Sequence, residues 1–266
     1  MTRIGKRFQE ELKERKALVA FLTAGYPSLE TTKKLFGVIE KNGADIIEIG
    51  VPFTDPLADG PVILQSALRS LESGTTLKKI LHMVREIRQS SELPIVLMSS
   101  FNPVYVYGQK AFVDDAVRAG VDGVIIPDLP PEEAGELAGF AGEKGLDLIY
   151  LLAPTSTGER VEMVARRSRG FIYYISLTGV TGVRTSLADG LQEKVKQIKN
   201  TATTPVLIGF GISGPDQARQ AAAISDGVII GSAIMKIIEQ TPDPAQRDIL
   251  VGDFIARVKQ AIQSSH

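Results

Sequence analysis

One carboxylate interrupts an otherwise apolar segment of this chain. Glu48 lies in residues 46–50, whose other members are three isoleucines and a glycine. Such a segment is typical of a strand covered on both faces, where an ionisable group must be paired, neutralised or functional. Because side chains alternate along a strand, Glu48 would point into the protein interior. Burial there should raise its pKa toward neutrality, as a general acid–base at physiological pH requires.

Glu48 could instead be a structural carboxylate, held by hydrogen bonds or by a buried cation. None of the eight short apolar segments of the chain contains Lys or Arg. The easiest partner for a structural carboxylate is therefore missing, which favours the catalytic role.

Two further carboxylates follow apolar segments and have two possible roles each. Asp59 precedes Gly60 and Pro61, so it could cap the next helix or act together with Glu48. Asp128 ends another apolar segment, so it could be functional or could equally cap a helix that starts at Pro131. Local chemistry alone leaves both questions open.

The residue types that are scarce limit the chemistry further. The chain has two histidines, His82 and His266, and no cysteine, so we expect no Ser-His-Asp triad, thiolate catalysis or metal site. A lysine that could form an imine is absent from the apolar segments. Acid–base chemistry by carboxylates remains, with a tyrosine as a possible helper. Tyr173 and Tyr174 are neighbours in one apolar segment, so one of them should face the interior.

Glycine-rich turns indicate a phosphorylated ligand. They occupy residues 179–182, 209–214 and 231–234, and the last two precede helical sequence. Backbone N–H groups at such turns and at helix N-termini bind phosphate. Residues 178–186 could also form a lid that excludes water.

Strand and helix patterns alternate eight times, which predicts a (β/α)8 barrel, also called a TIM barrel, as a single domain over residues 1–266. The expected strands are 17–23, 46–50, 95–99, 123–127, 147–152, 171–176, 205–209 and 227–231. The expected helices are 29–42, 61–73, 77–89, 111–119, 131–144, 159–168, 187–199 and 215–223. An extra N-terminal helix is expected at 4–16, where it could plug the barrel, and a last helix at 253–262. Long irregular stretches at 52–60, 100–110 and 178–186 follow strands, where barrel active sites lie. A doubly wound open sheet is the alternative, weakened by the lack of a Gly-x-Gly-x-x-Gly turn after the first strand.

Charge and hydropathy indicate the class of partner. Thirty basic and thirty-one acidic residues give a net charge of −1, which favours neither nucleic acid nor an anionic membrane. The first residues lack the apolar core of a signal peptide, and no apolar run approaches the length of a membrane span. We therefore expect a soluble cytoplasmic protein that binds a small molecule or another protein.

The chain resembles the tryptophan synthase alpha subunit family in three motifs that follow the family's order. They are residues 45–61, with Pro-Phe-Thr-Asp-Pro-Leu-Ala-Asp-Gly-Pro at 52–61, Gly-Val-Thr-Gly at 179–182 and Gly-Phe-Gly-Ile-Ser at 209–213. The resemblance runs from about Arg7 to Gln263. It implies a barrel lyase of tryptophan biosynthesis, which cleaves indole-3-glycerol phosphate to indole and glyceraldehyde 3-phosphate by a retro-aldol reaction. It also implies a beta subunit partner, in an α2β2 tetramer, that carries pyridoxal phosphate; no cofactor is expected in this chain.

The resemblance assigns roles to the carboxylates. Glu48 would be the proton donor and acceptor that lets indole C3 become tetrahedral. Asp59 would accept a hydrogen bond from the indole N–H and stabilise the positive charge that develops on the ring nitrogen. Pro52 and Asp55 match the surface that meets the beta subunit.

It also places the substrate contacts. Tyr173 matches the family's active-site tyrosine, and Thr181 a lid residue that contacts Asp59 on closure. Leu177 stands where some relatives have a charged lid residue. An apolar slot for the indole ring would be lined by Phe21, Leu22, Tyr173 and Phe210. The phosphate-binding turns correspond to Gly182, Gly211, Gly231 and Ser232.

Two other interpretations stay open at the level of sequence. One is a different phosphate-binding barrel enzyme, such as a sugar-phosphate epimerase or isomerase, although the metals, histidines or paired aspartates that those enzymes use are scarce here. The other is a non-catalytic barrel that serves only as a partner's regulatory subunit.

Overall fold

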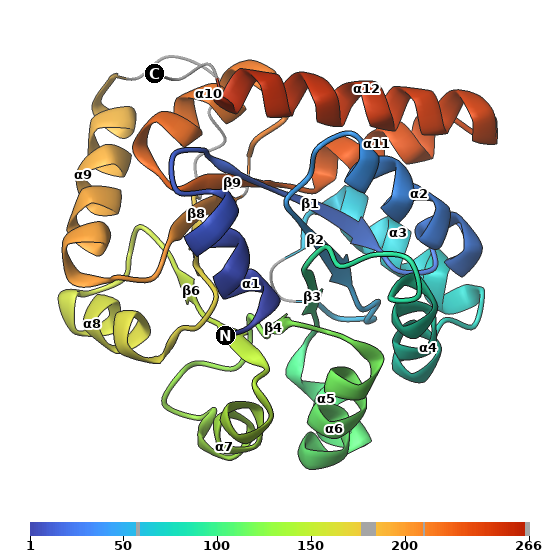
Figure 1. The fold of residues 1–266 in the computed structure, drawn as a ribbon, viewed down its shortest axis with the longest axis horizontal. Coiled ribbons are helices and arrows are strands. Elements are labelled where there is room, and N and C mark those ends of the chain that lie inside the picture. The colour runs from blue at the N-terminus through green and yellow to red at the C-terminus, as the bar shows by residue number, and fades with distance from the viewer. Residues whose placement is uncertain (57–58, 177–184, 210, 264–266) are drawn as a thin grey trace.

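A parallel sheet that closes on itself forms the centre of the molecule (Figure 1). The computed structural model describes residues 1–56, 59–176, 185–209 and 211–263. Within them the strand segments are β1 (Ala17–Thr23), β2 (Ile46–Gly50), β3 (Ile95–Met98), β4 (Gly123–Ile125), β5 (Asp147–Ile149), β6 (Leu151–Leu152), β7 (Ile172–Ile175), β8 (Val206–Gly209) and β9 (Gly227–Ile230). Their order is β5-β4-β3-β2-β1-β9-β8-β7-β6. The two ends of this order, β5 and β6, are consecutive pieces of one segment separated by Tyr150 alone, so the sheet is an eight-stranded barrel.

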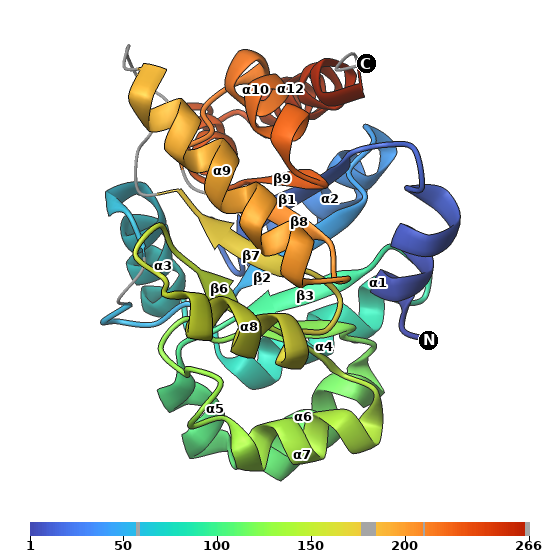
Figure 2. The same cartoon turned by 90° about the vertical axis from the view of Figure 1, so that its left-hand side faces the viewer.

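Helices surround the barrel on the outside, as the two views show (Figures 1 and 2). The helices within the described residues are α1 (Arg3–Lys6), the π-helical η1 (Arg7–Glu11), α2 (Leu29–Lys41), α3 (Pro61–Glu72), α4 (Leu77–Ile87), α5 (Phe101–Tyr107), α6 (Gln109–Ala119), α7 (Gly135–Lys144), α8 (Gly158–Arg167), α9 (Thr185–Thr201), α10 (Pro215–Ile224), α11 (Ser232–Gln240) and α12 (Pro244–Gln263). Every residue of β1 and β2 is buried, because the helices cover one face of each strand and the barrel interior the other. In the described part of the chain, no helix is long and apolar enough to cross a membrane.

The predicted barrel is confirmed, with local corrections. Residues 100–110 were expected to be irregular but contain α5, and α11 is the helix expected after the turn at 231–234, although it already begins at Ser232. The N-terminal helix is shorter than 4–16 and turns π-helical after Lys6, the helix expected from Pro131 begins at Gly135, and the last helix already begins at Pro244.

The N-terminal segment covers the end of the barrel at which the strands begin (Figure 2). Ile4 is fully buried there, and a Cβ atom at Gly123 or Gly170 would lie 3.1 or 3.2 Å from its side chain. The prediction that this segment plugs the barrel is therefore confirmed.

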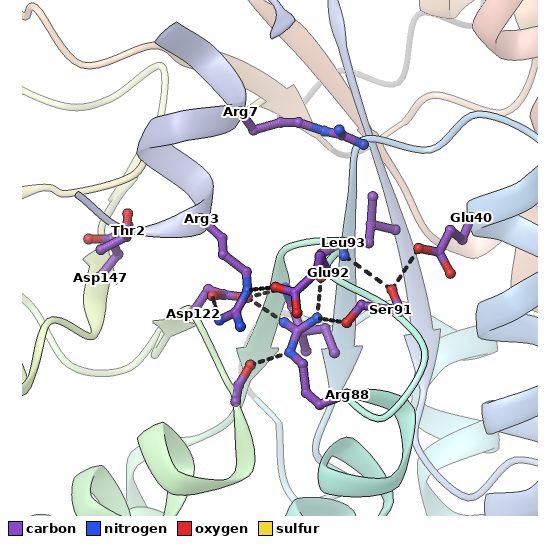
Figure 3. A network of polar contacts seen from close by, with 12 residues as sticks. Thr2, Arg3, Arg7, Glu40, Arg88, Ser91, Glu92, Leu93, Asp122 and Asp147 are labelled. Carbon is purple, nitrogen blue, oxygen red and sulfur yellow. Dashed lines mark hydrogen bonds and ion pairs between the residues drawn. The ribbon is translucent and has the colours of Figure 1, made fainter. Parts of the chain in front are cut away.

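A polar network surrounds this plug (Figure 3). Asp122 pairs with Arg88 at 2.5 Å and with Arg3 at 3.1 Å, and Arg88 also donates to three backbone carbonyls. The Thr2 hydroxyl donates to Asp147 at 2.6 Å. These contacts tie the first residues of the chain to β4 and β5.

Candidate active site

The site lies in a cavity at the carboxyl ends of the strands, opposite the N-terminal plug. The cavity has about 660 Å³ of empty space, including the open solvent at its mouth. Its size is in the range typical of small-molecule sites. Its lining residues are Phe21, Glu48, Asp59, Ile63, Met98, Tyr173, Gly211, Ile212, Ser213, Ile229, Gly231, Ser232 and Ala233.

Glu48 stands on the cavity wall with almost no exposure to solvent. It lies in register with Phe21 of β1, and 1% of its surface is exposed. Its Oε2 atom has no hydrogen-bond partner among the described residues. Burial and, second, the charge of Asp59 raise the pKa of its carboxyl group from 4.5 to about 8. Glu48 is therefore protonated at neutral pH, as expected for an acid–base residue.

Asp59 approaches the same cavity from the loop before α3. Burial raises the pKa of its carboxyl group from 3.8 to about 6, so it is mostly ionised at neutral pH. Helix α3 is capped by Gly60, with no side-chain hydrogen bond at the cap. The alternative role of Asp59 as a helix cap is therefore wrong.

Asp128 does act at a helix start, but at a different helix from the expected one. Its carboxylate accepts from the backbone N–H of Phe101 at 2.8 and 3.1 Å, at the first residue of α5. A contact between loops that are distant in sequence therefore helps to begin α5, which explains why local sequence did not reveal this helix.

Glycines give two aromatic rings room beside Glu48. A Cβ atom at Gly50 would lie 2.5 Å from the ring of Phe21, and one at Gly209 would lie 2.6 Å from the ring of Tyr173. Burial, together with the charges of Glu48 and Asp59, raises the pKa of Tyr173 well above 10. Its hydroxyl therefore stays protonated and can donate a hydrogen bond.

The alternation along β1 and β7 separates the predicted residues into two groups. Tyr173 and Phe21 line the cavity, whereas Tyr174 and Leu22 are buried outside its lining. Leu22 lies in register with Ile49, the residue after Glu48. The structure therefore brings Phe21 to the candidate site but does not bring Leu22 there.

Another part of the cavity lining presents backbone N–H groups. Gly211, with φ of +78°, and Gly231 and Ser232 line it together. Helix α11 begins at Ser232, and no side chain caps its first turn. Its free N–H groups and its dipole favour an anion at this point. The predicted site residues Thr181, Gly182 and Phe210, and also Leu177, lie outside the described residues.

A second hollow of about 480 Å³ adjoins the cavity under the loop after β2. Pro52 lines it, and Phe21, Asp59, Ile63 and Met98 line both spaces. Asp55 is exposed on this loop and accepts a hydrogen bond from the Thr54 hydroxyl at 2.6 Å.

Sequence reasoning missed Ile63 and Met98 as lining residues. Met98 lies in register with Gly50 at the end of β3, and Ile63 lies in the first turn of α3. The one feature of the sequence that could have indicated them is their position next to the predicted carboxyl ends of strands. Among the described residues, no group of three His, Cys, Asp or Glu side chains could hold a metal ion.

The fold and the site together define a class: a (β/α)8 barrel enzyme with a protonated and an ionised carboxyl group in one cavity, facing a helix N-terminus. The comparisons with known proteins identify the family within that class. A family model described as "Tryptophan synthase alpha chain" matches residues 8–262. The chain belongs to the tryptophan synthase alpha chain family, a lyase-type catalytic subunit, as predicted from its sequence.

Individual relatives match this chain over nearly its whole length. The chain is 52% identical over 265 residues to the tryptophan synthase alpha chain of Geotalea uraniireducens, with 99% of each chain covered. It is 49% identical over 263 residues to that of Geobacter sulfurreducens, covering 98% of this chain and 99% of the relative. The crystal structure of tryptophan synthase subunit alpha from Legionella pneumophila is similar with a TM-score of 0.90 at 36% identity, with 99% of both chains covered. These relatives support the alpha chain and not an epimerase or isomerase.

Proposed function

We propose that Glu48 and Asp59 of this chain catalyse the retro-aldol cleavage of indole-3-glycerol phosphate to indole and glyceraldehyde 3-phosphate. The observation that carries this proposal is the pairing of a buried Glu48 with a raised pKa and an ionised Asp59 in one cavity. Two titratable groups whose pKa values are separated by their environments are typical of acid–base catalysis.

Protonation of the indole ring is the first step. The Glu48 carboxyl group donates its proton to indole C3, which becomes tetrahedral and leaves a positive charge on the ring nitrogen. The Asp59 carboxylate accepts a hydrogen bond from the ring N–H and stabilises that charge. Exclusion of water around Glu48, which is 1% exposed, strengthens both interactions.

Cleavage of the carbon–carbon bond follows. The Glu48 carboxylate takes the proton of the hydroxyl group on the carbon attached to C3, and that carbon becomes the aldehyde. The electron pair of the broken bond returns to the ring and neutralises the nitrogen. Glu48 is protonated again at the end, so no external acid or base is consumed.

The substrate would lie in the cavity, with its phosphate and its indole ring against different lining residues. The phosphate binds beside Gly211, Gly231 and Ser232, where the first turn of α11 presents free N–H groups. The indole ring lies against Phe21 and Tyr173. Thr181, Gly182 and Phe210 are proposed to complete the lid, the phosphate site and the apolar slot.

The chain itself needs no cofactor in this mechanism, and pyridoxal phosphate belongs to the partner. We place a tryptophan synthase beta chain against Pro52 and Asp55, in a cytoplasmic α2β2 tetramer. The support is the family and the exposure of Asp55 on a loop that also borders the second hollow, which is lined by the buried Pro52 of the same loop. Asp55→Ala should weaken binding of the beta chain in a titration without changing the fold.

Indole release from indole-3-glycerol phosphate tests the chemistry. We expect Glu48→Gln and Asp59→Asn each to lower kcat by about a hundredfold or more. The matched control is Glu72→Gln, which changes an exposed glutamate of α3 and should keep the wild-type rate. If Glu48→Gln releases indole at the wild-type rate, the mechanism is wrong. If the wild-type chain activates a beta chain but never releases indole, the chain is a regulatory subunit.

A further inference from the structure

Helix α3 packs against the barrel through unusually small and polar residues. Its buried residues are Ser66, Ala67 and Ser70. With Thr23 at the end of β1, the two serines form a buried group that we call the hydroxyl seam (Thr23, Ser66 and Ser70), in which no member is more than 3% exposed. The buried face of a surface helix usually carries large apolar side chains. The buried hydroxyl groups of α3 therefore suggest a specific role.

The direction of each hydrogen bond in the hydroxyl seam can be worked out. The Ser66 hydroxyl donates to the carbonyl of Ile63 at 2.7 Å, which uses its single proton. It must therefore accept in its 2.7 Å bond with the Thr23 hydroxyl, and Thr23 is the donor. One turn further along, the Ser70 hydroxyl donates to the carbonyl of Ala24 at 2.5 Å. The end of β1 thus holds α3 at two successive turns.

Thr23 also contacts α11, the helix that begins at Ser232 in the cavity lining. The backbone N–H of Thr23 points to the sulfur of Met235 in α11 at 3.4 Å, and α3 and α11 pack against each other. Asp59 precedes α3, and Ser232 begins α11. Thr23 therefore contacts both helices whose amino ends border the cavity, α3 through Ser66 and α11 through Met235.

Hydrogen bonds restrict a helix in a way that apolar contacts do not. Apolar burial is non-directional, so a helix held by it can slide or rotate slightly at low cost. A hydroxyl pair at 2.7 Å weakens steeply when its distance or angle changes. A slip of one residue along the axis would be about 1.5 Å, and displacements of that size at a reacting group cost about a hundredfold in rate.

We propose that Thr23 and Ser66 are positioning residues, which hold α3 at the height that places Asp59 in the same cavity as Glu48. The proposal rests on the role given to Asp59 under the proposed function. Thr23 and Ser66 touch neither the reacting atoms nor a proton in transfer; they act through Asp59.

Isosteric variants of the full chain, with and without a beta chain, test this inference. Thr23→Val removes the donor and keeps the shape, and we expect kcat for indole release to fall about tenfold to a hundredfold with a smaller change in KM. Thr23→Ser keeps the donor and should restore most of the rate. Ser66→Ala should repeat the loss from the helix side. Ser73→Ala is the matched control, since its exposed hydroxyl at the C-terminal end of α3 donates to the carbonyl of Arg69 in the same helix.

A double-mutant cycle with Asp59→Asn separates positioning from a general loss of structure. If Thr23 acts through Asp59, adding Thr23→Val to Asp59→Asn should lower kcat no further. A full additional loss in that background, or a wild-type kcat for both Thr23→Val and Ser66→Ala, would overturn the inference. Wild-type activity of Asp59→Asn itself would instead overturn the role of Asp59 in the proposed function. Circular dichroism of each variant identifies any that fails to fold, and Ser66→Ala then replaces Thr23→Val in the cycle.

Discussion

Replacing Glu48 by glutamine should make the protein more stable, and the gain should grow with pH. Burial raises the pKa of Glu48 from 4.5 to about 8 on folding. Between these values the folded protein keeps a proton that the unfolded chain has lost, so the free energy of unfolding falls as pH rises, by about 1.4 kcal/mol per pH unit. Over the whole window the loss is on the order of 5 kcal/mol. The amide of the Glu48→Gln variant does not titrate in this range, so its free energy of unfolding does not fall in this way. Asp59 titrates in both proteins, so its contribution to the pH dependence largely cancels in the comparison.

Urea titrations at a series of pH values from about 5 to about 9 would measure this difference. The free energy of unfolding of the Glu48→Gln variant minus that of the wild type should rise steadily up to about pH 8 and then level off. Glu72→Gln, an exposed change on α3, serves as the control and should give a difference that does not vary in this way. A difference for Glu48→Gln that stays flat across this range would refute a buried carboxyl group with a raised pKa, and with it the basis of the acid–base mechanism.

Three further predictions concern activity and stability. The pH profile of kcat/KM should be bell-shaped, falling below about pH 6 where Asp59 becomes protonated and above about pH 8 where Glu48 loses its proton; a profile that is flat through both values would contradict the assignment. Gly50→Ala should push the ring of Phe21 into the cavity, costing about 1–3 kcal/mol in urea titrations and raising KM; an unchanged KM would contradict the packing. Arg88→Ala leaves the buried Asp122 carboxylate without its nearest cation, so the free energy of unfolding in urea titrations should fall by about 3–5 kcal/mol. The kcat should stay unchanged, because the candidate active site lies at the other end of the barrel.

Sequence reasoning located the strands well because burial on both faces leaves a clear signal. The bounds of β1 and β2 were predicted correctly, since their apolar runs end where the chain leaves the sheet. The burial of Glu48 followed from the same runs. The inward orientation of Tyr173 followed from alternation once one of the two tyrosines had to face the barrel, although the sequence alone did not say which.

The remaining features depend on contacts between distant segments. Helix α5 contains Pro103, and Ser100 at its N-cap makes no side-chain capping hydrogen bond. Asp128 from the next loop accepts from its first N–H instead. Only the structure could show that Asp59 does not cap α3, because Asp-Gly-Pro is a favourable start of a helix in any sequence. No pattern in the sequence indicated the hydroxyl seam, because serines on a helix usually face solvent and only the packing of α3 on β1 shows that these do not.

The network around the N-terminal plug also sets an order for events during synthesis on the ribosome. Arg3 is 119 residues from Asp122, and Thr2 is 145 residues from Asp147. Translation at about 5–20 residues per second therefore leaves Arg3 without this partner for about 6–24 seconds. The interval is longer for Asp45, because its partner Lys259 follows it by 214 residues. Residues made early are thus among the last to find their partners, and Asp45 gains the contact that ties α12 to the base of β2 only after every strand of the barrel has been made.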